Sequence, residues 1–305
     1  MTDPILLKFR WDLIEVYLFA VENHGRPPDS ESKMNSREYS ISAFFPAYND
    51  ADSIAKIVRS TASILPRLAK DYEVVVVNDG STDSTGEVLR RLAAEYPFLK
   101  VIEHRVNRGY GAALISGFAN CSKDLIFYTD GDGQYDVEEL AGLMKEFSEN
   151  TDLVNGYKIS RSDPLHRVIV GGIYQRLMRF LFQLRIRDVD CDFRLFRRSL
   201  LADLPLTFDS GVICVEMMKK FESSGCRIVE VPVHHYRRSH GSSEFFTFKH
   251  LRRIFAQLFV AWYKLMLAPA FWCHLRTAGI PAAERNRARH ASVRHHSLKG
   301  GVKIE

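Results

Sequence analysis

The sequence has few cysteines, and no pattern suggests that they act together. They lie at Cys121, Cys191, Cys214, Cys226 and Cys273, an odd number with no Cys-x-x-Cys pair. This usage argues against a disulfide framework or a zinc site built on paired cysteines, and it favours a reduced protein on the cytosolic side of a membrane.

Also missing is an uninterrupted apolar run of about 20 residues, the length that a membrane-spanning helix needs. The most apolar region, 251–272, is broken by Arg252, Arg253, Gln257, Lys264 and Pro269. It predicts an amphipathic helix lying in a membrane interface, and the basic residues around its start suit anionic headgroups. The alternative is a helix packed on the domain or on a second subunit of a homo-oligomer. Residues 5–21 are also interrupted by charges, so they predict an amphipathic helix rather than a signal peptide.

Most of the chain lacks an excess of positive charge. Residues 276–305 hold seven Lys or Arg against two Glu, and this difference equals the net charge of +5. The first 275 residues are therefore near neutral, which argues against a nucleic-acid partner. The basic tail lacks periodicity and is predicted to be disordered. The expected organisation is an N-terminal helix and linker over 1–38, a main domain over 39–246, an interfacial helix over 247–275 and the tail over 276–305.

The main domain alternates between strand and helix patterns. Strands are predicted over 41–45, 73–77, 100–103 and 124–129, and helices over 50–69, 83–95, 109–120 and 137–147. This alternation indicates an α/β fold with a mostly parallel sheet covered on both faces. Beyond residue 153 the pattern is less regular. It predicts a helix over 208–223 and a strand over 227–234, where Pro232 favours an edge position.

Two carboxylates follow the predicted strand over 124–129. The segment is Asp130-Gly131-Asp132-Gly133-Gln134, at the strand end where open parallel sheets bind ligands. Carboxylate oxygens in a tight cluster suit a divalent cation, which could neutralise a nucleotide diphosphate and help it leave. The alternative is an ordinary polar turn, since Asp and Gly are common turn residues.

Three other segments carry polar groups near predicted strand ends. They are Pro46-Ala47-Tyr48-Asn49-Asp50, Asn78 to Asp83 (NDGSTD) and Asn107 to Gly111 (NRGYG). Each is weak evidence alone, and Gly109-x-Gly111 lacks the rest of a dinucleotide-binding fingerprint. At successive strand ends of one sheet, all four segments would converge on one crevice.

This ordered set resembles the family-2 glycosyltransferases of the GT-A fold. PAYND is similar to their PAYNE, NDGSTD to their DDGSxD and DGDGQ to their DxD element. Segments 188–198 (DVDCDFRLFRR), 230–233 (EVPV) and 238–243 (RSHGSS) resemble the polyprenyl-phosphate branch, which includes dolichol-phosphate mannosyltransferase. The resemblance covers about residues 40 to 246. The chain departs from the pattern at Asn78, where Asp is usual, and at Glu244, where several relatives carry Lys.

The resemblance implies a role for each matching residue. Asp130 and Asp132 would hold Mg²⁺ or Mn²⁺. The nucleotide sugar would be bound by Pro46, Ala47, Tyr48, Asn49, Asp50, Asp79, Asn107, Gly109, Asp130 and Gly131. Catalytic roles are expected for Asp132, Gln134, Asp192 and Arg194, with Asp192 either orienting Arg194 or acting as a base. The acceptor phosphate would be bound by Arg161, Arg194, Arg238 and Ser243, with Arg194 as the first choice because a guanidinium binds phosphate bidentately.

The activity implied by the resemblance is transfer of a hexose, with inversion, from a nucleotide sugar of the UDP-glucose or GDP-mannose type to a polyprenyl or dolichyl phosphate. A lipid phosphate is already anionic near neutral pH, so it needs positioning cations more than a general base. Such an enzyme would work peripherally on the cytoplasmic face of a membrane, in cell-envelope synthesis. The alternatives are a family-2 enzyme with a hydroxyl acceptor in cell-surface polysaccharide synthesis, a nucleotidyltransferase and a non-catalytic scaffold.

Overall fold

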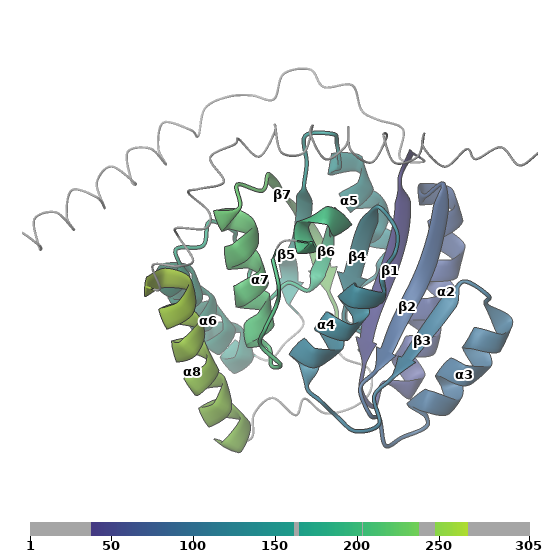
Figure 1. Ribbon diagram of the computed structural model, residues 1–305, viewed down its shortest axis with the longest axis horizontal. Coiled ribbons are helices and arrows are strands. Elements are labelled where there is room, and N and C mark those ends of the chain that lie inside the picture. The colour runs from purple at the N-terminus through teal and green to yellow at the C-terminus, as the bar shows by residue number, and fades with distance from the viewer. Residues whose placement is uncertain (1–37, 162–164, 203, 238–247, 268–305) are drawn as a thin grey trace, which may run out of the picture. The chain divides into compact units, whose positions relative to one another are not determined.

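The computed structural model describes residues 38–161, 165–202, 204–237 and 248–267 (Figure 1). The predicted basic tail and all of the N-terminal segment except Glu38 lie outside these residues. The side chains of 160–169 and 248–251 also lie outside the description.

The first half of the main domain follows the predicted alternation. Its elements are β1 (Ser40–Ala47), α2 (Ala51–Leu68), β2 (Asp71–Asn78), α3 (Thr85–Glu95), β3 (Leu99–Glu103), α4 (Tyr110–Asn120), β4 (Leu125–Thr129), the 3₁₀ turn η2 (Val137–Glu139) and α5 (Leu140–Glu146). The strands are rich in β-branched and aromatic residues, and the helices carry apolar residues along one side, so local pattern and fold agree here.

The second half contains three elements that the sequence analysis did not identify. They are β5 (Leu153–Arg161), α6 (Leu165–Phe182) and β6 (Phe193–Arg197). They are followed by the 3₁₀ turn η3 (Arg198–Leu201), α7 (Val212–Ser223), β7 (Ile228–His235), α8 (Phe248–Trp262) and a π-helical turn, η5 (Tyr263–Leu267). Helix α7 begins four residues later than predicted. Helix α8 confirms a helix in the apolar region, while its placement in a membrane interface stays a prediction.

The strands form one seven-stranded sheet within the described residues, in the order β3-β2-β1-β4-β6-β5-β7. All neighbouring strands are parallel except where β6 runs antiparallel to both β4 and β5. The predicted α/β fold with a mostly parallel sheet is confirmed, and β7, which contains Pro232, lies at the edge of the sheet as predicted.

Helices cover both faces of the sheet (Figure 1). Residues of α2, α3 and α5 share one apolar cluster with one face of the strands. Residues of α4, α6, α7 and α8 share a second cluster with the other face. The core is thus two apolar layers around the sheet, and polar side chains are left to collect at the strand ends.

The antiparallel strand β6 decides which residues meet at the ligand-binding edge. Thr129, the last residue of β4, pairs with Phe193, the first residue of β6. Asp130 follows one strand and Asp192 precedes the other, so the two carboxyls lie on the same edge although 62 positions separate them. No described helix is both long and apolar enough to cross a bilayer.

Candidate active site

Three acidic side chains gather where β4 ends and β6 begins, and we call Asp130, Asp132 and Asp192 the edge carboxylates. The Tyr110 hydroxyl, at the start of α4, donates to Asp130 Oδ1 at 2.7 Å. The backbone N–H of Gln134 donates to Asp132 Oδ1 at 3.0 Å, which fixes the tight DGDGQ turn. Burial, followed by the nearby Asp192 and Asp132, raises the pKa of Asp130 well above its usual value. A positive charge placed here would relieve that repulsion.

Arg194 does not lie where the sequence analysis expected it. Its side chain is 0% exposed. It donates from Nε to Asn155 Oδ1 at 2.8 Å, from Nη2 to the Val189 carbonyl at 2.6 Å, and from Nη1 to Asp192 Oδ1 at 3.1 Å and the Tyr128 hydroxyl. The expectation that Arg194 binds the acceptor phosphate directly is at odds with this burial. Its contacts in the structure, including the one with Asp192, are all within the protein.

Asp192 is contacted by side chains from three elements, β4, β6 and α7. Besides Arg194, the Tyr128 hydroxyl of β4 donates to Asp192 Oδ1 at 2.7 Å, and the Cys214 thiol of α7 lies 3.3 Å from the same oxygen. Burial raises the pKa of the Cys214 thiol well above its usual value, so the thiol remains a proton donor. Two roles were expected for Asp192: orienting Arg194 or acting as a base. The structure shows the contact between Asp192 and Arg194. The use of Asp192 as a base stays a prediction.

Asp79 organises the loop that leads into α4. It is buried, and it accepts the Arg108 N–H at 3.0 Å on Oδ1 and the Gly109 N–H at 2.9 Å on Oδ2. His104 Nδ1 lies 2.5 Å from Asp79 Oδ1, and His104 Nε2 lies 2.9 Å from the Ser116 hydroxyl. Sequence reasoning missed His104, because it belongs to no motif. Contact of Asp79 with a nucleotide stays a prediction.

The PAYND and NDGSTD segments form one interlocked unit. Asn49 adopts a positive φ of 57° and accepts the Thr82 N–H at 2.8 Å on its side-chain oxygen. The Asn49 N–H donates to the Ser81 hydroxyl at 3.0 Å, and Asp50 Oδ2 accepts the Tyr48 N–H at 3.0 Å. The two predicted nucleotide-binding segments are thus brought together.

Three glycines of the site are needed for close backbone approach. A Cβ on Gly131 would lie 2.5 Å from the Pro46 carbonyl oxygen, which also accepts the Gly131 N–H at 3.1 Å. A Cβ on Gly109 would lie 2.5 Å from the Asp209 carbonyl oxygen, and one on Gly111 would lie 2.2 Å from the Phe208 carbonyl oxygen. The Gly109-x-Gly111 pattern therefore has a packing explanation that does not involve phosphate.

Gln134 joins the DGDGQ turn to the end of β7. The side-chain Nε2 of Gln134 donates to the Tyr236 carbonyl at 3.0 Å, and the backbone carbonyl of Gln134 accepts the Tyr236 N–H at 2.8 Å. Ala47 ends β1, and its carbonyl accepts the Asp79 N–H at 2.9 Å, while Asn107 lies in the loop between β3 and α4. The role of Gln134 toward the sugar or acceptor stays a prediction.

Lys158 brings a positive charge that the sequence analysis did not single out. It lies on β5, and its Nζ donates to the Asp190 carbonyl at 2.7 Å. Burial lowers the pKa of Lys158, but the neighbouring Asp188, Cys191, Asp190 and Asp192 outweigh this effect and raise the pKa. Burial, opposed by Lys158, raises the pKa of Asp190 to about 7. Lys158 is therefore charged, while Asp190 can exchange a proton near neutral pH.

Some predicted residues cannot be placed. Arg238 and Ser243 lie outside the described residues, and only the backbone of Arg161, the last residue of β5, is described. Their predicted contact with the acceptor phosphate stays untested.

The donor chemistry of the edge fits a divalent cation. Asp130 and Asp132 offer hard oxygen ligands, and burial together with the neighbouring Asp192 and Asp132 raises the pKa of Asp130. No set of three or more His, Cys, Asp or Glu side chains in the described residues forms a ready-made metal site. Two carboxylates would therefore need oxygens from the ligand to complete the coordination of a metal ion.

Comparison with known proteins agrees with this geometry. Residues 42–204 match the family model described as Glycosyl transferase family 2. The undecaprenyl-phosphate 4-deoxy-4-formamido-L-arabinose transferases of Enterobacter sp. (strain 638) and Salmonella choleraesuis (strain SC-B67) are each 29% identical, over 209 and 207 residues. These matches cover 68% and 67% of this chain but 63% and 62% of the relatives, so the chain spans about three fifths of the length of the curated relatives it matches.

Solved structures show the same fold. Glucosyl-3-phosphoglycerate synthase from Mycobacterium tuberculosis, in complex with Mn²⁺, UDP and phosphoglyceric acid, superposes with a TM-score of 0.55 at 23% identity, covering 74% of this chain and 79% of that one. The same enzyme with Mg²⁺ and UDP gives a TM-score of 0.55 at 19% identity, covering 73% and 79%. At this identity the likeness establishes the GT-A fold alone.

Proposed function

Because the chain belongs to glycosyl transferase family 2, we propose that it moves a sugar from a nucleotide sugar to the phosphate of a polyprenyl carrier. The curated relatives named above act on undecaprenyl phosphate, and this supports a lipid-phosphate acceptor. The observation that carries the proposal is the meeting of Asp130, Asp132 and Asp192 at one edge of the sheet, where burial and the other two carboxylates raise the pKa of Asp130.

Asp130 and Asp132 would hold Mg²⁺ or Mn²⁺, an ion that neutralises the diphosphate leaving group when it is bound. Solved structures of the same fold hold these ions together with UDP. The Tyr110 hydroxyl keeps Asp130 oriented, and the Gln134 N–H does the same for Asp132. The interlocked PAYND and NDGSTD segments would bind the nucleotide of a UDP-glucose or GDP-mannose type of donor.

The acceptor would be held by Lys158 rather than by Arg194. Lys158 is charged and only half-buried, and it carries no side-chain ion pair in the described residues, whereas all the Arg194 contacts are internal. The reaction is a single displacement. An oxygen of the acceptor phosphate attacks the anomeric carbon, the bond to the diphosphate breaks, and the diphosphate takes the electron pair. The product then has the inverted configuration, so a retained configuration would contradict this mechanism.

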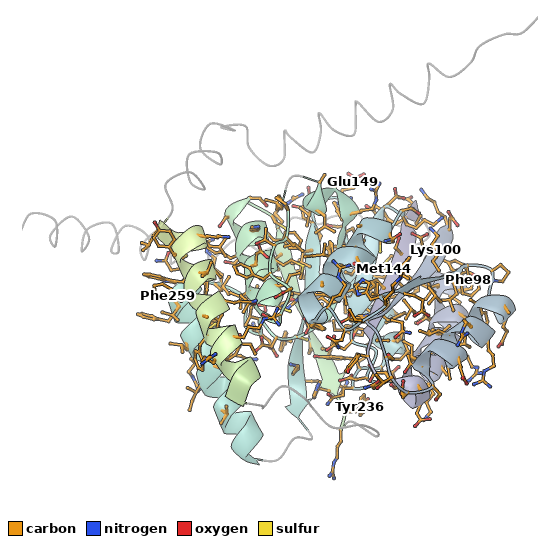
Figure 2. All side chains as sticks on the ribbon, turned by 60° about the horizontal axis from the view of Figure 1, so that its bottom comes forward. Phe98, Lys100, Met144, Glu149, Tyr236 and Phe259 are labelled. Carbon is orange, nitrogen blue, oxygen red and sulfur yellow. The ribbon has the colours of Figure 1, made fainter. Side chains whose placement is uncertain are left out.

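Two exposed helices suit contact with a bilayer. Helices α6 and α8 lie side by side, joined by a hydrogen bond from the Trp262 indole N–H to the Leu181 carbonyl (Figure 1). Together with the adjoining turn η5, they expose a set of large apolar side chains that we call the α6–α8 surface: Val170, Ile173, Leu177, Phe180, Phe255, Phe259, Val260, Tyr263 and Leu267. Figure 2 shows Phe259 projecting outward from α8. Arg176, Arg179, Arg252 and Arg253 lie on the same helices and complement anionic headgroups. Peripheral attachment to the cytoplasmic face of a membrane follows from this proposal.

Transfer of radiolabel tests the function directly. UDP-glucose or GDP-mannose is incubated with polyprenyl phosphate, with Mg²⁺ or with EDTA, and the organic phase is counted. Metal-dependent label in the organic phase supports the proposal. We expect Asp132→Asn to reduce transfer at least about 100-fold, equal to about 3 kcal/mol of transition-state stabilisation. Asp136→Asn is the matched control, since Asn keeps the cap that Asp136 gives to the Glu138 N–H.

A hydroxyl acceptor is the second candidate, and Asp190 is the observation that favours it. With a pKa of about 7, its carboxyl could accept the proton of a sugar hydroxyl near neutral pH. Metal-dependent consumption of the donor without label in the organic phase would move the assignment to this candidate.

A further inference from the structure

The segment between η3 and α7 contacts α8 through an ion pair and a hydrogen bond, both made by the Asp209 carboxylate. Asp209 Oδ2 accepts from Arg253 Nη2 at 2.5 Å, and Asp209 Oδ1 accepts from Gln257 Nε2 at 2.7 Å. The Ser210 hydroxyl donates to the side-chain carbonyl of Gln257. Both carboxylate oxygens of Asp209 are therefore engaged by α8.

The backbone of the same residue supports the first turn of α4. The Asp209 carbonyl oxygen accepts the Gly111 N–H at 3.0 Å. Gly109 and Gly111 let the two backbones touch, since a Cβ at either position would lie 2.5 Å or less from the carbonyl oxygen of Asp209 or Phe208. With no side chain between them, a displacement of Asp209 must displace the start of α4.

The start of α4 leads directly to the edge carboxylates. Tyr110 stands between the two glycines, and its hydroxyl is the group that donates to Asp130 at 2.7 Å. The connection from α8 to Asp130 thus runs through two residues, Asp209 and Tyr110, joined by the Gly111 hydrogen bond.

Helix α8 faces two ways. Leu258 and Ala261 are buried against the core, whereas Phe255 and Phe259 belong to the exposed α6–α8 surface. In the described part of the chain, α8 is the element that both contributes to that surface and contacts Asp209.

We propose that Asp209 is a positioning residue that couples the seating of α8 to the orientation of Asp130, so that contact of the α6–α8 surface with a bilayer orders the metal-binding edge. The part of this inference that involves a bilayer rests on the proposed function. The link between α8 and Asp130 stands on the contacts of Asp209 alone.

Two neighbouring arginines provide a matched test. Arg253→Ala removes a contact with Asp209, and Arg252→Ala removes the same charge from the same exposed helix, where Arg252 has no hydrogen bond or ion pair with another described residue. In the full chain without ligand, we expect amide hydrogen exchange at residues 108–114 to rise about fivefold in Arg253→Ala, the low end for coupling between sites. Exchange there in Arg252→Ala should match the wild type. Gln257→Ala should reproduce the effect of Arg253→Ala.

A binding measurement separates positioning from a loss of general stability. Free Mn²⁺ is titrated by electron paramagnetic resonance in the presence of UDP, and of GDP in parallel. We expect Arg253→Ala to weaken Mn²⁺ binding about fivefold relative to Arg252→Ala, with the melting temperatures of the two variants equal. A purely structural role would lower the melting temperature and leave the Mn²⁺ affinity of the folded protein unchanged.

Vesicles of equal parts phosphatidylglycerol and phosphatidylcholine complete the test. At vesicle concentrations that saturate binding of both variants, which lose the same charge from the α6–α8 surface, the vesicles should slow exchange at 108–114 in the wild type and in Arg252→Ala but not in Arg253→Ala. Equal exchange at 108–114 in both arginine variants without vesicles would overturn the role of Asp209. A difference between the variants without any vesicle effect would keep the link from α8 to Asp130 and overturn its coupling to a bilayer. Neither result depends on the sugar-transfer assay, so failure of the proposed function is detected separately.

Discussion

Glu73 is a buried carboxyl group near the beginning of β2, and Asp130 is a half-buried one just beyond the end of β4. Their surroundings shift their pKa values in opposite directions. Glu73 accepts from the Ser42 hydroxyl at 2.6 Å, from the Ser122 N–H at 2.6 Å and from Lys100 Nζ at 2.5 Å. Burial would raise the pKa of Glu73, but these donors outweigh it and lower the pKa to about 2. Asp130 accepts one hydrogen bond, from the Tyr110 hydroxyl. Burial and the nearby carboxylates of Asp192 and Asp132 raise its pKa.

The difference separates an acid that holds the fold together from one that is kept ready for a ligand. Donors around Glu73 satisfy its charge within the protein, so the ionised form stabilises the folded state. At Asp130, burial and the neighbouring Asp192 and Asp132 disfavour the ionised form, which a bound cation would favour. Four substitutions test this contrast.

Replacing Arg194 should have the largest effect. Arg194→Met removes the cation that compensates Asp192 and leaves a buried carboxylate without its partner, so we expect a loss of about 3–5 kcal/mol in the free energy of unfolding. Urea unfolding monitored by circular dichroism measures it. Arg198→Met is the control, since the Arg198 side chain is exposed and its hydrogen bond within the described part of the chain is to the Lys123 carbonyl. A loss below about 1 kcal/mol for Arg194→Met would show that the buried network contributes little.

Glu73→Gln should remove a pH-dependent part of the stability. The folded-state pKa of about 2 lies below the ordinary value of 4.5, so the stabilisation is complete above pH 4.5 and disappears as the pH falls toward 2. The full shift corresponds to about 3 kcal/mol. Unfolding free energies at several pH values should show wild type and variant converging in acid. Parallel curves across this range would contradict the assignment.

Asp130→Asn should stabilise the metal-free protein while abolishing metal-dependent activity. Asn keeps an oxygen that can accept from Tyr110 and removes the repulsion from Asp132 and Asp192, so we expect a gain of about 1 kcal/mol, or about 2–4 °C in melting temperature. Thermal melts in EDTA measure the gain, which should shrink in Mn²⁺ if the ion relieves the wild-type repulsion. A lower melting temperature in EDTA would mean that the charge at 130 is already compensated.

Asn78→Asp should give the smallest effect. Asn78 Nδ2 donates to Glu103 Oε2 at 2.7 Å, and Asp would place a second carboxylate there. Since Glu103 is exposed, we expect a loss of about 0.5–1 kcal/mol, restored in the double variant Asn78→Asp/Glu103→Gln. Unfolding free energies of the four proteins complete the cycle. This pairing also gives a physical reason for Asn at a position where the family usually has Asp.

The first half of the fold could be predicted because local pattern and tertiary structure agree there. In β2, Val74 to Val77 form a run that suits a strand buried on both faces, and the strand lies within one or two residues of the predicted limits. The second half is different. Strand β6 contains Arg194 and Arg197 within five residues, and β5 contains Asn155, Gly156 and Lys158, so neither has the apolar composition expected of an interior strand.

Site residues could be predicted where they lie together in one continuous segment of the sequence. Contacts between residues that are far apart in the sequence were missed. Asp130 and Asp132 follow a recognisable strand. The groups that bury Arg194 are Tyr128, Asn155 and Val189, and no local pattern shows that these side chains surround one guanidinium. His104 and Tyr110 matter through their contacts with Asp79 and Asp130, which only the folded chain reveals.

The pairing of β4 with β6 joins two parts of the chain that could be produced as separate fragments. The strands β3, β2, β1 and β4 come from residues before 130, while β6, β5 and β7 come from residues after 152, and the two groups join through five residue pairs between 125–129 and 193–197. A cut between Glu149 and Thr151 would leave every described strand whole in one fragment or the other. Because Asp130 belongs to one fragment and Asp192 to the other, metal-dependent activity would report the reassembly of the two pieces in a fragment-complementation experiment.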